Sequence, residues 1–291
     1  MAERIDRFEL LLPLIGLLLY FLVALALFTI QTLRSGLPVD GEVAERPASR
    51  LLGRYLRHYL MWVLAPYERW LVRAGVSPNA VTLASLATAI GAAVALALGH
   101  FAVGGWLYLL TGILDILDGR IARATGRESR AGAFFDSVID RYAELAVFSG
   151  LAVYYRSSPA LVAVLLAAIG SVMVSYVRAR GEALGVDVKV GTMQRPERLL
   201  YLGAVVAHSP LWEALRPSTG RPLYAPVVVA LALLGLTANV TAVRRIMHAL
   251  RQLEPPRPAA APTPLPERRR RIADGFEAGA RRLLARLRTA G

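Results

Sequence analysis

Two pairs of aspartates are the residues of this sequence best placed to do chemistry. Asp115 and Asp118 lie three residues apart at the end of one apolar segment, and Asp136 and Asp140 lie four residues apart at the start of the next. Residues at these spacings share one face of a helix, so a short connection between two helices can bring all four carboxylates together. Carboxylates beside apolar helices are costly without a partner of opposite charge.

The partner predicted for these carboxylates is a hard divalent cation. The sequence has no cysteine and only 4 histidines, which favours oxygen-liganded Mg²⁺ or Mn²⁺ over zinc and excludes disulfides and thiol nucleophiles. We expect one or two ions, two being the main prediction. The alternative is that the acids only pair with arginines of a solvated loop. Those arginines are Arg120, Arg123, Arg127, Arg130 and Arg141.

The elements that must position the aspartates are membrane helices. Hydrophobic residues make up 55% of the chain and charged ones 19%, with a mean hydropathy of +0.46, which points to the bilayer as solvent. We predict an all-α, polytopic membrane helix bundle with six core transmembrane helices, an extra N-terminal one and cytoplasmic surface helices. The expected spans are residues 10–33, two within 74–114, then 132–155, 159–177, 199–212 and 223–243.

The net charge of +13 could indicate nucleic-acid binding, but the basic residues lie between the apolar segments. The positive-inside rule places all four basic groups in the cytoplasm if the C-terminus is inside and the N-terminus outside. The groups lie at residues 50–73, 120–130, 178–198 and from 244 onward. We therefore predict an integral inner (cell) membrane protein whose active site faces the cytoplasm. A cleaved signal peptide is the alternative for residues 10–33, whose length and mixed preceding charges favour a retained helix.

The chain is predicted to have three parts. Residues 1–36 form the extra N-terminal helix, residues 50–252 the membrane domain, and residues 253–291 a Pro/Ala linker followed by a basic amphipathic tail. Basic and apolar residues alternate at helical spacing in residues 50–62 and again in residues 268–288. This pattern is typical of helices that lie on a membrane surface.

The aspartates belong to the pattern Asp-x-x-Asp-Gly-x-x-Ala-Arg, eight residues, Gly-x-x-x-Asp-x-x-x-Asp. This pattern resembles the signature of the CDP-alcohol phosphotransferases, and the likeness extends over about residues 50–250. The resemblance implies transfer of a phosphatidyl group from CDP-diacylglycerol, or a similar CDP-lipid, to a small hydroxylated acceptor, with release of CMP. It also implies that Asp115, Asp118 and Asp136 hold the metals, and that Asp140 is both a ligand and the catalytic base. Two cations and a carboxylate base suit such a phosphoryl transfer.

Further residues are assigned to the donor site by the same resemblance. Gly119 and Gly132 are expected to be small so that helices and nucleotide can approach closely, and Arg123 is expected to contact donor phosphate. Ser77-Pro78 on its own predicts only a capped helix start. By resemblance, the residues lining the nucleotide site are Pro78, Asn79, Ala80, Val81 and Ser129.

Two arginine-containing segments bear on the acceptor. One carries Ser175, Arg178 and Arg180, and the other carries Arg195 and Arg198 at a predicted helix N-terminus, which favours anions. Guanidinium groups bind phosphate bidentately, so four arginines near a metal site suit a phosphorylated acceptor. They could instead be anchors that snorkel to lipid headgroups.

These segments resemble those of the prokaryotic phosphatidylinositol-phosphate synthases and their archaeal relatives, which implies inositol phosphate as acceptor. Glycerol 3-phosphate, used by phosphatidylglycerophosphate synthases, is the main alternative, and unphosphorylated serine or inositol a weaker one. A divalent-ion transporter is a distant alternative, because its acids should lie near mid-membrane on several helices. The family resemblance also implies a homodimer.

Overall fold

The computed structural model describes residues 2–37, 54–188, 195–215 and 220–253. All the regular elements in these ranges are helices, as the sequence predicts. Predicted features at residues 50–53, 194, 254–266 and 268–288 lie outside them. The helices are α1 (Ala2–Ser35), α3 (Arg54–Arg73), α4 (Pro78–Ala97), α5 (Phe101–Ala124), α6 (Arg130–Tyr154), α7 (Ala160–Ala183), α8 (Arg195–Leu215) and α9 (Ala225–Leu253).

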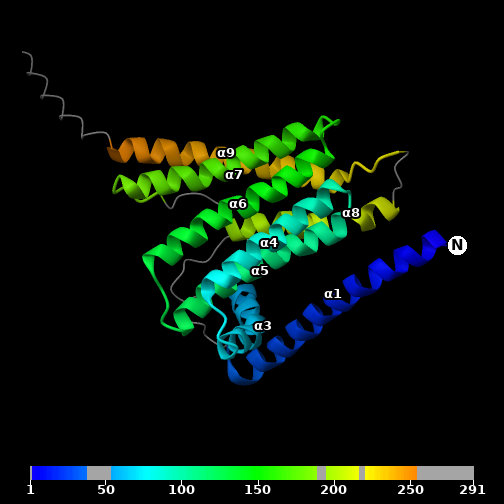
Figure 1. Ribbon diagram of the computed structural model, residues 1–291, viewed down its shortest axis with the longest axis horizontal. Coiled ribbons are helices and arrows are strands. Elements are labelled where there is room, and N and C mark those ends of the chain that lie inside the picture. The colour runs from blue at the N-terminus through cyan, green and yellow to red at the C-terminus, as the bar shows by residue number, and fades with distance from the viewer. Residues whose placement is uncertain (1, 38–53, 189–194, 216–219, 254–291) are drawn as a thin grey trace, which may run out of the picture. The chain divides into compact units, whose positions relative to one another are not determined.

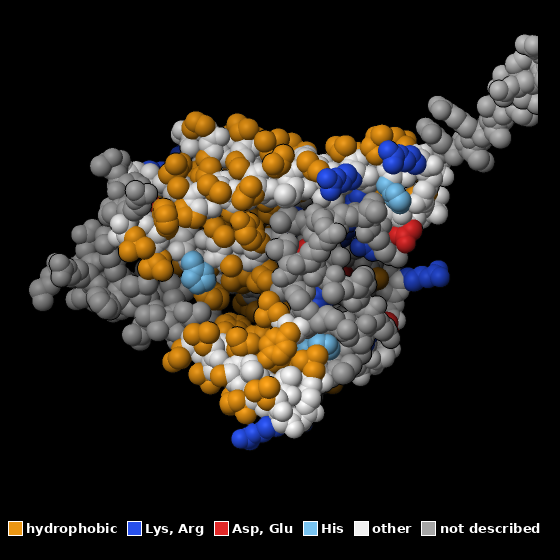
Figure 2. Space-filling model, turned by 180° about the vertical axis from the view of Figure 1, so that it is seen from behind, with side chains coloured by type: hydrophobic (Ala, Val, Ile, Leu, Met, Phe, Trp, Pro, Cys, Tyr) orange, Lys and Arg blue, Asp and Glu red, His pale blue; other side chains and the backbone are white. Residues whose placement is uncertain are grey.

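Four of the described helices, α4, α5, α7 and α9, are long and apolar enough to cross a membrane, and α1 contains a shorter apolar stretch. Large hydrophobic side chains lie exposed on the outside of these helices, among them Ile90, Val94, Ile169 and Leu236. Figure 2 shows one face on which hydrophobic side chains predominate and basic ones are scattered. Such a surface fits a protein whose helices face lipid.

The uncharged stretch at residues 74–114 is divided into two helices, as predicted. Gly99, with φ +90°, makes the turn between α4 and α5, because only glycine adopts this conformation without strain. Ser77 caps α4 by accepting a hydrogen bond from the Ala80 amide at 3.2 Å. The second helix continues beyond residue 114 as far as Ala124, so Asp115 and Asp118 lie inside it.

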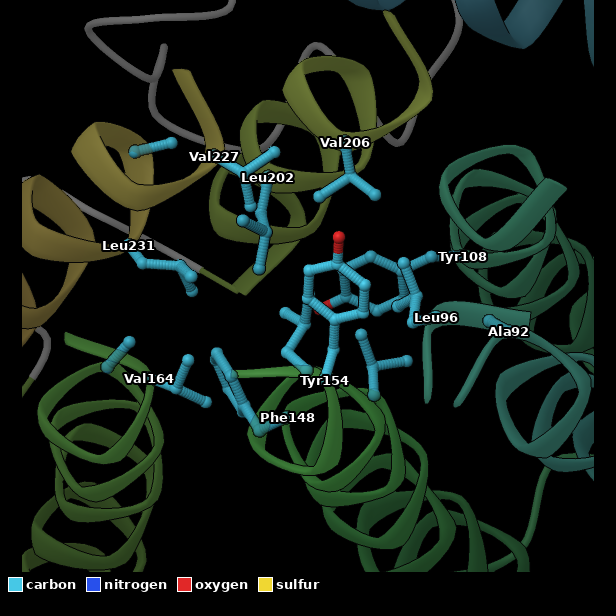
Figure 3. Close-up of a cluster of buried hydrophobic side chains, with 14 of the residues drawn as sticks. Ala92, Leu96, Tyr108, Phe148, Tyr154, Val164, Leu202, Val206, Val227 and Leu231 are labelled. Carbon is cyan, nitrogen blue, oxygen red and sulfur yellow. The ribbon is translucent and has the colours of Figure 1, made fainter. Parts of the chain in front are cut away.

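The chain divides into one compact unit of residues Met1–Ala249 and another of Leu250–Gly291, of which only the end of α9 is described. In the first unit α4 packs on α5 and α6, α5 on α8, and α6 on α7. The main buried cluster contains side chains from each of the helices α4 through α9. Among them are Leu96, Tyr108, Phe148, Leu202 and Leu231 (Figure 3). These contacts fix the rotation of each helix about its own axis.

Two glycines allow especially close helix contacts. A methyl group at Gly105 of α5 would come within 2.2 Å of the Ala207 amide nitrogen of α8, and one at Gly150 of α6 within 2.3 Å of the Ala93 carbonyl oxygen of α4. Small residues at such crossings let two backbones touch, as is common between membrane helices. α5, which carries the first aspartate pair, is therefore held tightly against α8.

α3 packs through two different faces. One face, with Leu64, contacts Val81, Leu117 and Ile121 at the ends of α4 and α5. The other, with Tyr59 and Val63, contacts α1. Figure 1 shows the C-terminal part of α1 beside α3. α3 therefore lies between α1 and the helix ends that carry the aspartate motif.

Candidate active site

Three of the four predicted metal ligands come together where α5 ends and α6 begins. Carboxylate oxygens of Asp115, Asp136 and Asp140 all lie within 4.8 Å of one another. The connection at residues 125–129 is short, and Ser129 caps α6 by accepting a hydrogen bond from the Gly132 amide at 3.0 Å. The cap fixes the start of α6 nearly two turns before Asp136. Helical spacing and a short loop thus bring together three of the four carboxylates that the sequence predicts to meet.

Asp118 is placed differently from the other three. It is buried at 5% exposure and accepts a hydrogen bond of 2.6 Å from the Thr82 hydroxyl of α4. It lies outside the group of three carboxylates within 4.8 Å. Thr82 was not predicted as a site residue. Its only sequence signal is a polar side chain on an otherwise apolar helix face, and residues of this kind are common there without a functional role.

Arg195, the first residue of α8, closes the cluster from the opposite side. Its Nη1 lies 2.9 Å from Asp115 Oδ1 and 2.5 Å from Asp140 Oδ2. One guanidinium therefore balances part of the charge of two carboxylates, which is a strong, charge-assisted arrangement. The sequence placed Arg195 in an acceptor pocket near the metals. The structure shows it in direct contact with two of the aspartates.

The cluster fits a divalent cation in its charge and in its unused ligand atoms. Two of the three clustered carboxylates share the Arg195 guanidinium, and Asp136 Oδ1 is buried without a hydrogen-bond partner among the described residues. Buried carboxylate oxygens almost always have a partner, and an oxygen-liganded cation would supply one here. The residues present therefore fit the predicted Mg²⁺ or Mn²⁺.

The predicted donor residues lie where α4 and α6 begin and α5 ends. A methyl group at Gly132 would meet Ser129 Oγ at 3.1 Å and Asn79 Oδ1 at 3.9 Å, so the N-termini of α4 and α6 are neighbours. A methyl group at Gly119 would lie 3.4 Å from Arg123 Nη1, so the Arg123 side chain folds back over its own helix. Helix N-termini favour phosphate, and two converge here.

The remaining members of the donor set differ in exposure. Pro78 occupies the first turn of α4, and Ala80 is exposed beside it. Val81 is 3% exposed and packs against Leu64, Leu117 and Ile121. Val81 therefore holds the start of α4 in place. Its helical position turns it toward α3 and α5.

The predicted acceptor arginines fall into two groups. Arg198 is 1% exposed and bonds the buried Glu144 of α6, with Nη2 3.2 Å from Oε1. Arg178 bonds Glu182 on its own helix at 2.8 Å in an exposed position. Arg180 is also exposed and Ser175 half-buried. Arg195 and Arg198 thus join the carboxylates of α5 and α6, whereas the α7 pair lies at the surface.

Glu144 and Arg245 are further charged residues that sequence reasoning missed. Glu144 follows Asp140 by one helical turn, a spacing that could have shown it on the same face. Arg245 of α9 is buried and donates to the Val174 carbonyl of α7 at 2.7 Å. Its position in a basic segment gave no indication of burial.

Residues 75–242 match the family model for CDP-alcohol phosphatidyltransferase. The chain belongs to the CDP-alcohol phosphatidyltransferase family. It is therefore an enzyme of a membrane-embedded transferase family, and the aspartate motif lies within the matched residues.

Curated relatives of this phosphatidyltransferase include two named phosphatidylinositol phosphate synthases. The protein from Streptomyces avermitilis is 41% identical over 157 residues, covering 52% of this chain and 64% of that protein. The one from Mycobacteroides abscessus is 37% identical over 193 residues, covering 64% and 82%. The chain thus spans just under two thirds of the first relative and over four fifths of the second.

Solved structures of Mycobacterium tuberculosis phosphatidylinositol phosphate synthase (PgsA1) share the fold. The complex with CDP-DAG has a TM-score of 0.56 at 28% identity, covering 68% of this chain and 98% of that one. The complex with manganese and citrate has the same TM-score and identity, covering 64% and 88%. The family expected from the aspartate pattern is confirmed.

Proposed function

We propose that this enzyme transfers the phosphatidyl group of CDP-diacylglycerol to a hydroxyl of inositol phosphate and releases CMP. The observation that carries the proposal is Arg195, a phosphate-binding side chain held 2.5 Å from Asp140 and 2.9 Å from Asp115. This geometry puts an anion-binding group beside the proposed base, where a phosphorylated acceptor needs it. The relatives named phosphatidylinositol phosphate synthases support this acceptor over glycerol 3-phosphate.

Asp115, Asp118, Asp136 and Asp140 are the residues that would hold two Mg²⁺ ions, with Mn²⁺ as a substitute. Bound divalent cations stabilise the negative charge that develops on the attacked phosphorus and the departing CMP. The Thr82 hydroxyl orients Asp118 through its hydrogen bond of 2.6 Å. The manganese in the PgsA1 structure supports a metal of this class.

Asp140 acts as the general base. Its carboxylate takes the proton of the acceptor hydroxyl, the hydroxyl oxygen forms a bond to the lipid-linked phosphorus, and the bond from that phosphorus to CMP breaks. CMP leaves with the electron pair of that bond. Arg195 holds the acceptor phosphate and keeps the attacking hydroxyl near Asp140, so the reaction gains from proximity.

The donor's pyrophosphate lies between the N-termini of α4 and α6. This site is lined by Asn79, Ser129, Pro78, Ala80, Gly119 and Gly132. The Arg123 side chain contacts a donor phosphate by rotating away from Gly119. Val81 contributes by fixing the first turn of α4 against α3. The proximity of Gly132 to Asn79 and Ser129 supports this arrangement.

The acceptor site has an inner and an outer part. Arg195 and Arg198 form the inner part, where the buried Glu144 orients Arg198. Ser175, Arg178 and Arg180 at the end of α7 form the outer part. Arg178 has an exposed partner, Glu182, which an incoming phosphate can replace because exposed ion pairs are weak.

The topology we propose has six core spans, α4 to α9, and α1 as a seventh. The aspartate cluster then lies at the cytoplasmic side of the inner membrane, beside the basic loops. Residues 1–36, 50–252 and 253–291 are the extra helix, the catalytic membrane domain, and the linker with its surface tail. We also propose a homodimer, by family resemblance.

A radiolabelled assay tests the acceptor. Purified enzyme with CDP-diacylglycerol and Mg²⁺ should form labelled lipid with inositol phosphate, and far less with glycerol 3-phosphate, inositol or serine. A faster reaction with glycerol 3-phosphate would overturn the acceptor while leaving the family unchanged.

A further inference from the structure

A pocket between α1 and α3 lies outside the catalytic machinery. It has a volume of about 340 Å³ and is lined by Tyr20, Val23 and Leu27 of α1 and by Trp62, Pro66 and Arg69 of α3, with small apolar residues between them. Ligand pockets begin at roughly this size, so this one has room for part of a single hydrocarbon chain. Both helices precede residue 75, where the match to the family model starts.

The helices on either side of this pocket are fixed to each other by polar and aromatic contacts. The Tyr59 hydroxyl donates to the Phe21 carbonyl at 2.6 Å, and the hydroxyls of Thr29 and Tyr55 lie 2.7 Å apart. Phe28 packs its ring against Tyr55, Tyr59 and Trp62. Such contacts hold α1 at a set distance from α3, so the pocket is a built feature of the fold.

The chemistry of the lining changes from apolar to basic at one end. Among the described residues of the lining, Arg69 is the one charged residue, and no acidic residue of this part of the chain lines the pocket beside it. Among the described residues it donates one hydrogen bond, from Nε to the Ala65 carbonyl at 3.3 Å, which leaves both Nη groups available. Guanidinium groups bind phosphate through these donors.

The basic end of the pocket lies among residues typical of the membrane–water boundary. Tyr20, Tyr67 and Trp70 are exposed around Arg69, and the hydroxyls of Tyr20 and Tyr67 lie 3.2 Å apart. Exposed tyrosine and tryptophan gather at the level of lipid headgroups. An arginine at one end of an apolar pocket matches the charge of a phospholipid headgroup.

We propose that this pocket binds one anionic glycerophospholipid of the surrounding membrane, with an acyl chain between α1 and α3 and its phosphate on Arg69. A net negative headgroup is favoured because the described lining residues include no carboxylate to receive the amine of a zwitterionic one. The lipid is distinct from the CDP-lipid donor, since Leu64 and Glu68 turn the opposite face of α3 toward the aspartate motif. The inference does not depend on the proposed acceptor.

Fluorescence of Trp62 tests the proposal directly. In the full chain, Trp70, Trp106 and Trp212 are replaced by Phe, and the protein in mild detergent is titrated with phosphatidylglycerol brominated on its acyl chains. Bromine quenches tryptophan on contact, so quenching should saturate at one lipid per chain. Phosphatidylcholine with the same chains should need about tenfold more lipid. Equal curves for the two lipids, or quenching that never saturates, would overturn the site.

Matched variants distinguish a specific lipid site from a general attraction of anionic lipid to the basic residues of α3. Arg69→Gln should remove the preference for phosphatidylglycerol, whereas Arg73→Gln, the same change outside the lining, should keep it. Val23→Phe, at a half-exposed lining position, should abolish saturable quenching with little effect on folding. If Arg73→Gln weakened binding as much as Arg69→Gln, the attraction would be diffuse and the proposal wrong.

Competition distinguishes the pocket from the donor site. Unbrominated CDP-diacylglycerol, added with Mg²⁺ at equimolar amounts, should leave the quenching by phosphatidylglycerol unchanged. If it displaced the brominated lipid at this ratio, the pocket would belong to the donor site. Circular dichroism of each variant confirms that its helices are intact.

Discussion

Arg195 Nη1 lies 2.5 Å from Asp140 Oδ2, which joins the start of α8 to the second aspartate pair. The same nitrogen is 2.9 Å from Asp115, 80 residues earlier in the chain. Any change at Arg195 therefore alters both the proposed acceptor contact and the proposed base.

Replacing Arg195 by Ala should raise the KM for inositol phosphate far more than that for CDP-diacylglycerol. Loss of one charge-assisted contact costs roughly 1.5–3 kcal/mol, or about tenfold to a hundredfold in KM. Initial rates with each substrate varied in turn measure both constants. The Arg195→Lys variant, which keeps the positive charge, should recover part of the loss, and Arg156→Ala, a change at an exposed arginine outside the site, serves as control. Equal changes in KM for both substrates would show that Arg195 has a purely structural role.

Asn substitutions should separate the roles of the carboxylates. Asn keeps one ligating oxygen but loses the charge and cannot accept a proton at neutral pH. Asp136→Asn should lose activity that higher Mg²⁺ or Mn²⁺ partly restores. Asp140→Asn should stay inactive at any metal concentration while still binding CDP-lipid with metal. Turnover by folded Asp140→Asn near the parent rate would disprove its assignment as base.

Thr82→Val should weaken the function of Asp118, because it removes the hydrogen bond of 2.6 Å to a buried carboxylate. A hydrogen bond to a charged group contributes about 1.5–3 kcal/mol, so the Mg²⁺ concentration for half-maximal activity should rise about tenfold or more. Thr82→Ser keeps the hydroxyl and should behave like the parent. An unchanged Mg²⁺ dependence in folded Thr82→Val would show that Asp118 needs no such support.

The Glu68–Arg120 pair should hold α3 against the aspartate motif. The Arg120 side chain is only 14% exposed and the Glu68 side chain 16%. Arg120 directly follows Asp118-Gly119 in the sequence. Glu68→Gln should lower the free energy of unfolding by about 1–3 kcal/mol, between the values for surface and buried pairs. Glu182→Gln breaks the exposed pair with Arg178 and should cost below about 0.5 kcal/mol. Thermal unfolding in one detergent compares them, and equal shifts would contradict the difference in burial.

A cysteine at Arg127 should test the orientation, because the chain has no other cysteine. Arg127 is exposed in the loop between α5 and α6. The single thiol of Arg127→Cys should resist impermeant reagents added outside intact cells and react after the cells are opened. Reaction from outside would reverse the proposed topology.

Local spacing was enough to predict the helices and the main site. Within each pair the aspartates are separated by about one helical turn, three residues for Asp115 and Asp118 and four for Asp136 and Asp140. This geometry follows from the helical backbone alone. The same holds for the helix start at Ser77-Pro78, which depends on the chemistry of one or two residues. The family was predictable for this reason too, since its pattern is a local one.

Contacts between segments distant in the chain could not be predicted from the sequence and became evident only in the tertiary structure. The hydrogen bond from Thr82 to Asp118, the pair of Arg198 with Glu144 and the burial of Val81 each require a particular rotation of one helix against another. Nearly every face of these helices is apolar, so periodicity does not specify that rotation. It is set by close approaches such as Gly105 on Ala207, which involve the shapes of both helices at once. For this reason the sequence alone determined the aspartate cluster, while only the packed bundle decided that Arg195 closes it and that α1 and α3 enclose a pocket.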